Sequence, residues 1–194
     1  MLLRRIAQLT LAVAVAAVPL VAVAAPAAAA PSAGYVRAIT YSGGGQYSAQ
    51  ADQAARIWNS RVPNIRMSRA SGSGNIRIHV VSGGGSRATI GHGSGTIYLD
   101  VQQINQGYSA LRVVTHEMGH TLGLRDNYNG NCAILMSGGS AGTSCTNSNP
   151  STAEANWVNQ SFANGLAEVP VGRDTAVEWS AECYPGPDRE HVHA

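Results

Sequence analysis

Residues 116–126 carry two histidines and two acidic residues at spacings suited to a catalytic zinc ion. His116 and His120 lie four residues apart, so on an α-helix both imidazoles leave the same face about one turn apart and can reach one ion. Gly123 can end that helix in a left-handed conformation and return the chain, which brings Asp126 toward the same ion. Three protein ligands leave one position of a tetrahedral zinc ion open, which is typical of catalytic sites.

Glu117 follows the first histidine and supplies a candidate general base. Zinc lowers the pKa of a bound water, and an adjacent carboxylate can accept the proton and later deliver it to a leaving amine. A surface helix with two solvated histidines would give the same short motif by chance. Against that alternative, the apolar run 111–115 can bury the helix, Gly123 and Asp126 follow at the required offsets, and a methionine-containing turn, the Met-turn, follows at 132–138.

Hydrophobic periodicity predicts the elements that must position these residues. We expect strands over 36–42, 64–69, 75–81 and 96–100, and helices over 50–61, 109–122 and 151–164. The last helix begins with a capping box, in which Ser151 is followed three residues later by Glu154. The segment 127–148 reads as a loop that is long for a small domain, which indicates a functional role.

Two other histidines are weaker candidates for the metal site. His79 lies in a strand where apolar and polar residues alternate, and the pattern places it on the solvated face of the sheet. His92 lies in the glycine-rich segment 91–95 and could be a further histidine near the metal, but Asp126 fits the third position of the motif better.

The long motif with Asp126, followed by the Met-turn, resembles the snapalysin family of small secreted neutral metalloproteases, within the metzincin-like zinc proteases. The resemblance extends from about residue 36 to 165. Short matches occur in order at 57–60, 91–95, 135–139, 144–147 and 163–165. The resemblance implies a small α+β metzincin-like fold with a twisted, mostly parallel sheet, an antiparallel edge strand, a central zinc helix and a C-terminal helix.

The same resemblance implies details of the site. The strand 96–100 is expected to be the edge strand beside the cleft, where an extended peptide could add to the sheet. The glycines of 91–95 would let a substrate backbone come close to that edge, and the equally weighted alternative is that 91–95 is a plain glycine-rich turn. Tyr128 is a candidate stabiliser of the oxyanion, with a packed loop tyrosine as the alternative. Met136 is expected to form an apolar floor beneath the ligands. Calcium is doubtful, because residues 109–111 lack the aspartate and threonine that family members can carry there.

The two ends of the chain predict secretion and a tail. Residues 1–29 have two arginines, an apolar stretch and an alanine-rich exit, which indicates a cleaved signal peptide more than a membrane anchor. Residues 30–35 read as a short pro-segment or N-terminal remnant, and 36–165 as the metalloprotease domain. Residues 166–194 carry six acidic residues against two arginines, show no helix or strand pattern, and are expected to be a disordered acidic tail.

Cysteine content agrees with an extracellular location. Cys132 and Cys145 bracket the Met-turn, and in a secreted protein they are expected to form a disulfide. A cysteine zinc ligand is the alternative, although two histidines and Asp126 already fill the site. Cys183 is left over and is either free or paired between chains.

The combined prediction is a secreted, monomeric, zinc-dependent endopeptidase that acts on proteins, with an aromatic preference after the scissile bond implied by the resemblance. Nucleic-acid binding is not expected, because nine arginines against five acidic residues in 36–165 are scattered and form no basic stripe. No membrane partner is expected after signal cleavage. The alternatives are a non-catalytic zinc-binding module, which Glu117 disfavours, and an interaction protein that acts through residues 166–194.

Overall fold

A five-stranded sheet forms one layer of the domain. The computed structural model describes residues 36–163, so the predictions for 1–29, 30–35, 166–194 and Cys183 lie outside the described residues. The strand order is β2-β1-β3-β5-β4. The strands are β1 (Arg37–Gly43), β2 (Ile65–Arg69), β3 (Ile76–Val81), β4 (Arg87–Ala88) and β5 (Gly95–Asp100). The β1–β2, β1–β3 and β3–β5 pairs are parallel and β4–β5 is antiparallel, which confirms a mostly parallel sheet with an antiparallel edge strand.

The position of the edge strand was predicted wrongly. Residues 96–100 belong to β5, which pairs with β3 on one side and with β4 on the other. The edge is the two-residue strand β4, in which Arg87 lies opposite Tyr98 and Ala88 opposite Ile97. A strand of two residues has too short a pattern to be detected by alternation. The segment 91–95 therefore leads into an interior strand.

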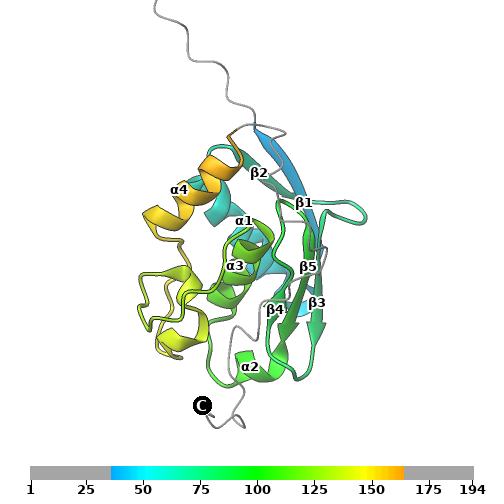
Figure 1. Ribbon diagram of the computed structural model, residues 1–194. Coiled ribbons are helices and arrows are strands. Elements are labelled where there is room, and N and C mark those ends of the chain that lie inside the picture. The colour runs from blue at the N-terminus through cyan, green and yellow to red at the C-terminus, as the bar shows by residue number, and fades with distance from the viewer. Residues whose placement is uncertain (1–35, 164–194) are drawn as a thin grey trace, which may run out of the picture. The chain divides into compact units, whose positions relative to one another are not determined.

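The helices are α1 (Ser48–Arg61), α2 (Val101–Asn105), α3 (Ala110–Thr121) and α4 (Thr152–Ser161), with 3₁₀ turns η1 (Gly45–Tyr47) and η2 (Leu135–Ala141). Helices α1 and α3 pack on one side of the sheet (Figure 1). The short elements α2, η1 and η2 were not predicted. Within residues 36–163, no helix combines the length and hydropathy needed to cross a membrane.

Helix α3 is the central element of the domain. Every residue from Arg112 to Thr121 is buried. Trp58 of α1 is fully buried, and its indole Nε1 donates to the carbonyl oxygen of Thr115 at 3.1 Å, which fixes α1 against α3. Ser109 caps the start of α3 by accepting a hydrogen bond from the Arg112 N–H. The helix that carries the zinc motif is therefore held on several sides.

The polypeptide after α3 is secured by two predicted features. The capping box of α4 is present, with Ser151 and Glu154 each accepting from the other's backbone N–H. Cys132 and Cys145 form the predicted disulfide. Closing a loop of this length stabilises the fold by about 3 kcal/mol through the lower entropy of the unfolded chain.

Tyr41 of β1 belongs to a polar cluster with α1 and β2. Its hydroxyl donates to Asp52 Oδ1 at 2.7 Å, and Arg69 Nε donates to the same oxygen at 2.8 Å. Burial, followed by the hydrogen bond to Asp52 and the negative charge of that carboxylate, raises the pKa of Tyr41 to about 12, although Arg69 and Arg56 oppose the shift. The folded protein thus favours the neutral phenol.

We expect this phenol to make stability fall in the alkaline range. The contribution of Tyr41 is complete below the ordinary pKa of 10.0 and is lost as the pH rises toward about 12. The free energy of unfolding should fall across this range by up to about 2 kcal/mol. Tyr41→Phe should lack that part of the fall, which urea denaturation at several pH values measures. A fall in Tyr41→Phe as steep as that of the parent would refute the expectation.

Candidate metal centre

Three side chains converge beneath the C-terminal half of α3. Nε2 of His116 lies 3.2 Å from Nε2 of His120 and 3.2 Å from Oδ1 of Asp126. Nε2 of His120 lies 3.4 Å from the same carboxylate oxygen. Both imidazoles are fully buried, and 15% of the Asp126 side chain is exposed. Among residues 36–163, these three form the group of histidine, cysteine and acidic side chains that could hold a metal ion.

The end of α3 creates this convergence. Gly123 has a positive φ of 101°, a conformation that costs a residue with a side chain, and its N–H donates to the His120 carbonyl at 2.8 Å. Leu124 N–H donates to the carbonyl oxygen of Gly119 at 3.0 Å. The chain therefore reverses immediately after the helix, and Asp126 comes back beside the two histidines. The local turn explains why the short spacing works.

Backbone carbonyls fix the orientation of both imidazoles. Nδ1 of His116 lies 3.0 Å from the carbonyl oxygen of Leu135, and Nδ1 of His120 lies 2.8 Å from that of Leu124. A carbonyl oxygen can only accept, so in each neutral ring the proton is on Nδ1 and the Nε2 lone pair faces the cluster. A histidine that binds a metal through one ring nitrogen commonly donates a hydrogen bond from the other one in this way.

The dimensions of the cluster fit zinc. Nitrogen and oxygen ligands lie about 2.0–2.1 Å from zinc, and tetrahedral geometry then separates ligand atoms by about 3.3 Å. The three separations among His116, His120 and Asp126 are 3.2, 3.2 and 3.4 Å. Two imidazoles and one carboxylate form a donor set that zinc accepts, with one position left for a water or substrate.

The acidic and basic groups of the cluster shift each other's pKa. Burial by itself raises the pKa of Asp126, but hydrogen bonds to His116 and His120 and their positive charges outweigh it and hold that pKa well below the ordinary range. Burial also lowers the pKa of His120, but the hydrogen bond to Asp126, the negative charges of Glu117 and Asp126, and the Leu124 carbonyl raise it overall. An anionic carboxylate thus faces two basic nitrogens at one point.

The other predicted site residues differ in how exposed they are and in which residues they contact. Glu117 is fully buried in α3 next to His116. The Tyr128 side chain is 49% exposed in the segment that follows Asp126. His79 is exposed on the sheet, as predicted. His92 is exposed and stacks on Phe162 at 4.0 Å between ring centroids, and it is not part of the metal-binding group.

Met136 forms a floor beneath α3 without belonging to the metal-binding group. It is 1% exposed. A Cβ atom on Gly119 would lie 2.9 Å from the Met136 sulfur and 3.3 Å from Cζ2 of Trp58, so only glycine lets these side chains approach the helix this closely. Gly119 lies between the two histidines in the helix, and this contact therefore supports the ligand-bearing turn directly.

Sequence reasoning missed the residues that hold the Met-turn in place. Arg112 is 2% exposed and donates to the backbone of the Met-turn, and Glu154 accepts from two of its N–H groups. Arg112 stands as a lone charge within the apolar run 111–115, which was the one available signal that it is buried and paired. Glu154 was recognised for its capping role alone.

The sequence is similar to a set of bacterial proteases. Residues 36–165 match the family described as the Streptomyces extracellular neutral proteinase (M7) family. The extracellular small neutral protease of Streptomyces sp. (strain C5) is 44% identical over 144 residues, covering 72% of this chain and 60% of that protein. The protein of the same name from Streptomyces caespitosus is 45% identical over 133 residues, covering 66% of this chain and 98% of that protein. The match spans 53–62% of the length of three such relatives.

Two solved structures are similar over smaller parts of this chain. Myroilysin is 26% identical, with a TM-score of 0.36 over 46% of this chain and 48% of that chain. High choriolytic enzyme 1, a hatching enzyme zinc-protease from Oryzias latipes, is 27% identical, with a TM-score of 0.34 over 47% of this chain and 46% of that chain.

Proposed function

This chain belongs to the Streptomyces extracellular neutral proteinase (M7) family, and we propose that it is a secreted zinc endopeptidase. The observation that carries this proposal is the convergence of three ligand atoms, from His116, His120 and Asp126, at separations of 3.2–3.4 Å. The relatives are named extracellular small neutral proteases, which supports both secretion and protein substrates.

In this proposal His116, His120 and Asp126 hold the ion and Glu117 moves the proton. When bound, zinc supplies a Lewis acid that polarises a carbonyl and acidifies water. Glu117 accepts a proton from the attacking water and delivers it to the leaving amine. The carbonyls of Leu135 and Leu124 keep both imidazoles oriented with Nε2 toward the ion. Burying the carboxylate of Glu117 costs free energy, and the proposed role in proton transfer beside His116 accounts for why it is buried there.

Metal removal tests the proposal most directly. Dialysis against a strong chelator should abolish casein hydrolysis, and about one equivalent of zinc per chain should restore it, because three ligands define one site. Urea denaturation should also show that the metal-free protein is less stable, since an ion that binds the folded state alone stabilises it. Hydrolysis that persists in the metal-free protein would exclude a zinc-dependent enzyme.

Tyr128 is proposed to stabilise the developing oxyanion. It lies two residues after Asp126, and its side chain is half exposed, which leaves it accessible to a substrate. Tyr128→Phe should lower the catalytic rate about tenfold or more, because one donor to an oxyanion contributes up to about 10²–10³-fold. Zinc content should stay at the parent level. Equal kcat values for the two proteins would leave Tyr128 as a packed loop residue.

The substrate preference is the finest part of the proposal. The family resemblance supports an aromatic residue just after the scissile bond, and a peptide series that varies this position measures the preference as a ratio of kcat/KM values. A series with no preference at this position would reject that part alone and leave the endopeptidase activity unaffected.

A further inference from the structure

We infer that Arg112 is a positioning residue for the candidate metal ligand His116, acting through the carbonyl oxygen of Leu135. The inference rests on the proposed metal site. Arg112 lies on α3 four residues before His116 and is 2% exposed. Its role differs from that of a surface arginine, because its guanidinium is directed into the protein and contacts backbone on a different segment.

The guanidinium joins α3 to the Met-turn. Nη2 of Arg112 donates to the carbonyl oxygens of Ile134 at 2.9 Å and Leu135 at 3.3 Å, and to Oγ of Ser137 at 3.0 Å. Leu135 O is also the acceptor for Nδ1 of His116 at 3.0 Å. A single carbonyl oxygen therefore accepts from the guanidinium and from the imidazole. The guanidinium of Arg112 thus helps to place the oxygen that orients the His116 ring.

A carboxylate holds the opposite side of the same peptide segment. Glu154 Oε2 accepts from the Leu135 N–H at 3.2 Å, and Oε1 accepts from the Met136 N–H at 2.8 Å. Oε2 also accepts from the Ser151 N–H at 2.6 Å. Glu154 therefore belongs both to the capping box of α4 and to the contacts that hold the Met-turn. Residues 134–137 thus lie between a cation and an anion. Charge-assisted hydrogen bonds of this kind are stronger than neutral ones.

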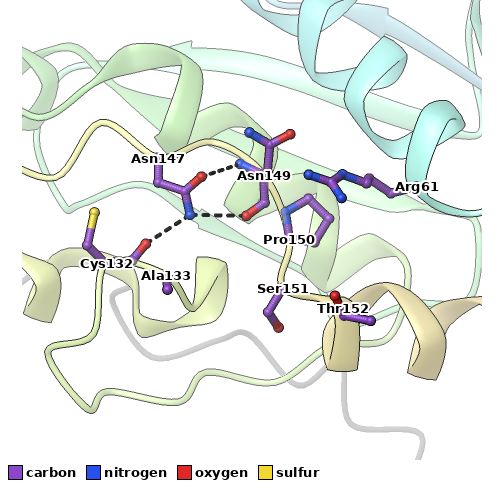
Figure 2. Close-up of a pocket in the computed structure, with 8 residues that line it drawn as sticks. All are labelled: Arg61, Cys132, Ala133, Asn147, Asn149, Pro150, Ser151 and Thr152. Carbon is purple, nitrogen blue, oxygen red and sulfur yellow. Dashed lines mark hydrogen bonds between the residues drawn. The ribbon is translucent and has the colours of Figure 1, made fainter.

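Arg112 also links α3 to the disulfide loop. Nη1 donates to the carbonyl oxygen of Asn147, and the Asn147 side-chain amide donates to the Cys132 carbonyl oxygen at 2.9 Å. Figure 2 shows this amide beside a surface hollow between the disulfide loop and the start of α4. Both ends of the Met-turn are therefore tied to the same guanidinium, directly or through Asn147.

These contacts predict an effect on metal binding as well as on stability. Changes to groups that orient metal ligands lower metal affinity by about 10–100-fold. Without the guanidinium, Leu135 O loses one of the contacts that fix its position, so the acceptor that keeps the His116 proton on Nδ1 is less firmly placed. The ring is then less often presented with Nε2 free for the ion. A residue with a purely structural role would lower stability without changing the imidazole tautomer.

The test compares Arg112→Met with the parent and with Asn59→Ala. Methionine keeps much of the apolar stem and removes the donors. Asn59 clamps Met67 by two hydrogen bonds, of 2.9 and 2.7 Å, where α1 meets β2, so its loss destabilises the fold away from the metal cluster. Zinc affinity is measured by chelator competition. The His116 tautomer is measured by ¹⁵N NMR on metal-free protein at about pH 8.5, above the ordinary histidine pKa.

We expect the zinc Kd of Arg112→Met to rise about 10–100-fold, with loss of the fixed Nδ1–H tautomer of His116. Asn59→Ala should stay within about twofold of the parent, because distant sites act independently. If Arg112→Met does not fold, Arg112→Lys takes its place. One ammonium group keeps a donor but cannot reach all the acceptors of the guanidinium, so zinc affinity should still fall, by less than the roughly 10–100-fold expected for Arg112→Met. Parent-like affinity and tautomer in the folded arginine variant would overturn the inference.

The outcomes separate this inference from the proposed function. A parent protein that binds no zinc would reject the proposed function, and the tautomer comparison on metal-free protein would still decide the role of Arg112. A parent that binds zinc and hydrolyses casein, together with equal affinity losses in Arg112→Met and Asn59→Ala, would reject the role of Arg112 alone.

Discussion

Replacing Glu117 by glutamine should lower the rate of casein hydrolysis by about 10²–10⁴-fold while leaving bound zinc at the parent level. Glutamine has nearly the same shape as glutamate but cannot accept and return a proton near neutral pH. Because the side chain is fully buried, the similar shape also limits the disturbance of α3. Initial rates, together with zinc measured on the same samples, separate loss of the base from loss of the metal.

A matched acidic control makes this result specific. Asp52 lies in the cluster of Tyr41 and Arg69, with 40% of its side chain exposed. Asp52→Asn should retain the parent rate of hydrolysis at a temperature where both variants are folded. If Glu117→Gln hydrolyses casein as fast as the parent, Glu117 is a structural carboxylate and a different group must handle the proton.

The convergence of His116, His120 and Asp126 could be anticipated because its determinants are local. The spacing of His116 and His120 needs only the helical repeat, and Gly123 needs only the left-handed turn that glycine favours. Asp126 then returns over a few residues. The capping box of α4 and the disulfide were also predictable, since each depends on a short pattern or on a pair of cysteines in a secreted sequence.

The contacts that orient the cluster could not be anticipated in the same way. Leu135 contributes its carbonyl oxygen, and any residue type has one, so the sequence carries no signal of its contact with His116. Arg112 and Glu154 meet the Met-turn only after the chain between them has folded back over α3. Long-range pairing of this kind depends on tertiary structure and not on local propensity.

The prediction that residues 96–100 form the edge of the sheet was wrong for a related reason. In β5, Ile97 and Leu99 are buried while Thr96 and Tyr98 are partly exposed, a pattern that an edge strand and an interior strand with one solvated face share. The deciding neighbour is β4, whose two residues give no periodic signal. Strand order in the sheet is therefore a property of pairing that alternation alone does not encode.

Replacing Asp126 by asparagine should weaken zinc binding by more than about 100-fold, the upper range for loss of an outer-shell partner, because Asp126 is proposed to be a direct ligand. Asparagine preserves the size of the side chain but removes the negative charge that faces Nε2 of His116 and His120. A neutral amide oxygen is a poorer zinc ligand than a carboxylate. Hydrolysis should fall with zinc occupancy and recover partly when free zinc is raised.

Asp126→His separates the loss of a ligand from a general disturbance of the turn. Histidine offers a zinc-binding nitrogen, and the partial exposure of Asp126 leaves room on the solvent side for a longer side chain. This variant should therefore bind zinc more tightly than Asp126→Asn, although both remove the same carboxylate. Chelator competition measures the two Kd values, and urea denaturation of the metal-free proteins corrects for changes in the fold. Parent-like affinity in Asp126→Asn would show that Asp126 is not a ligand and would reduce the proposed site to the two histidines.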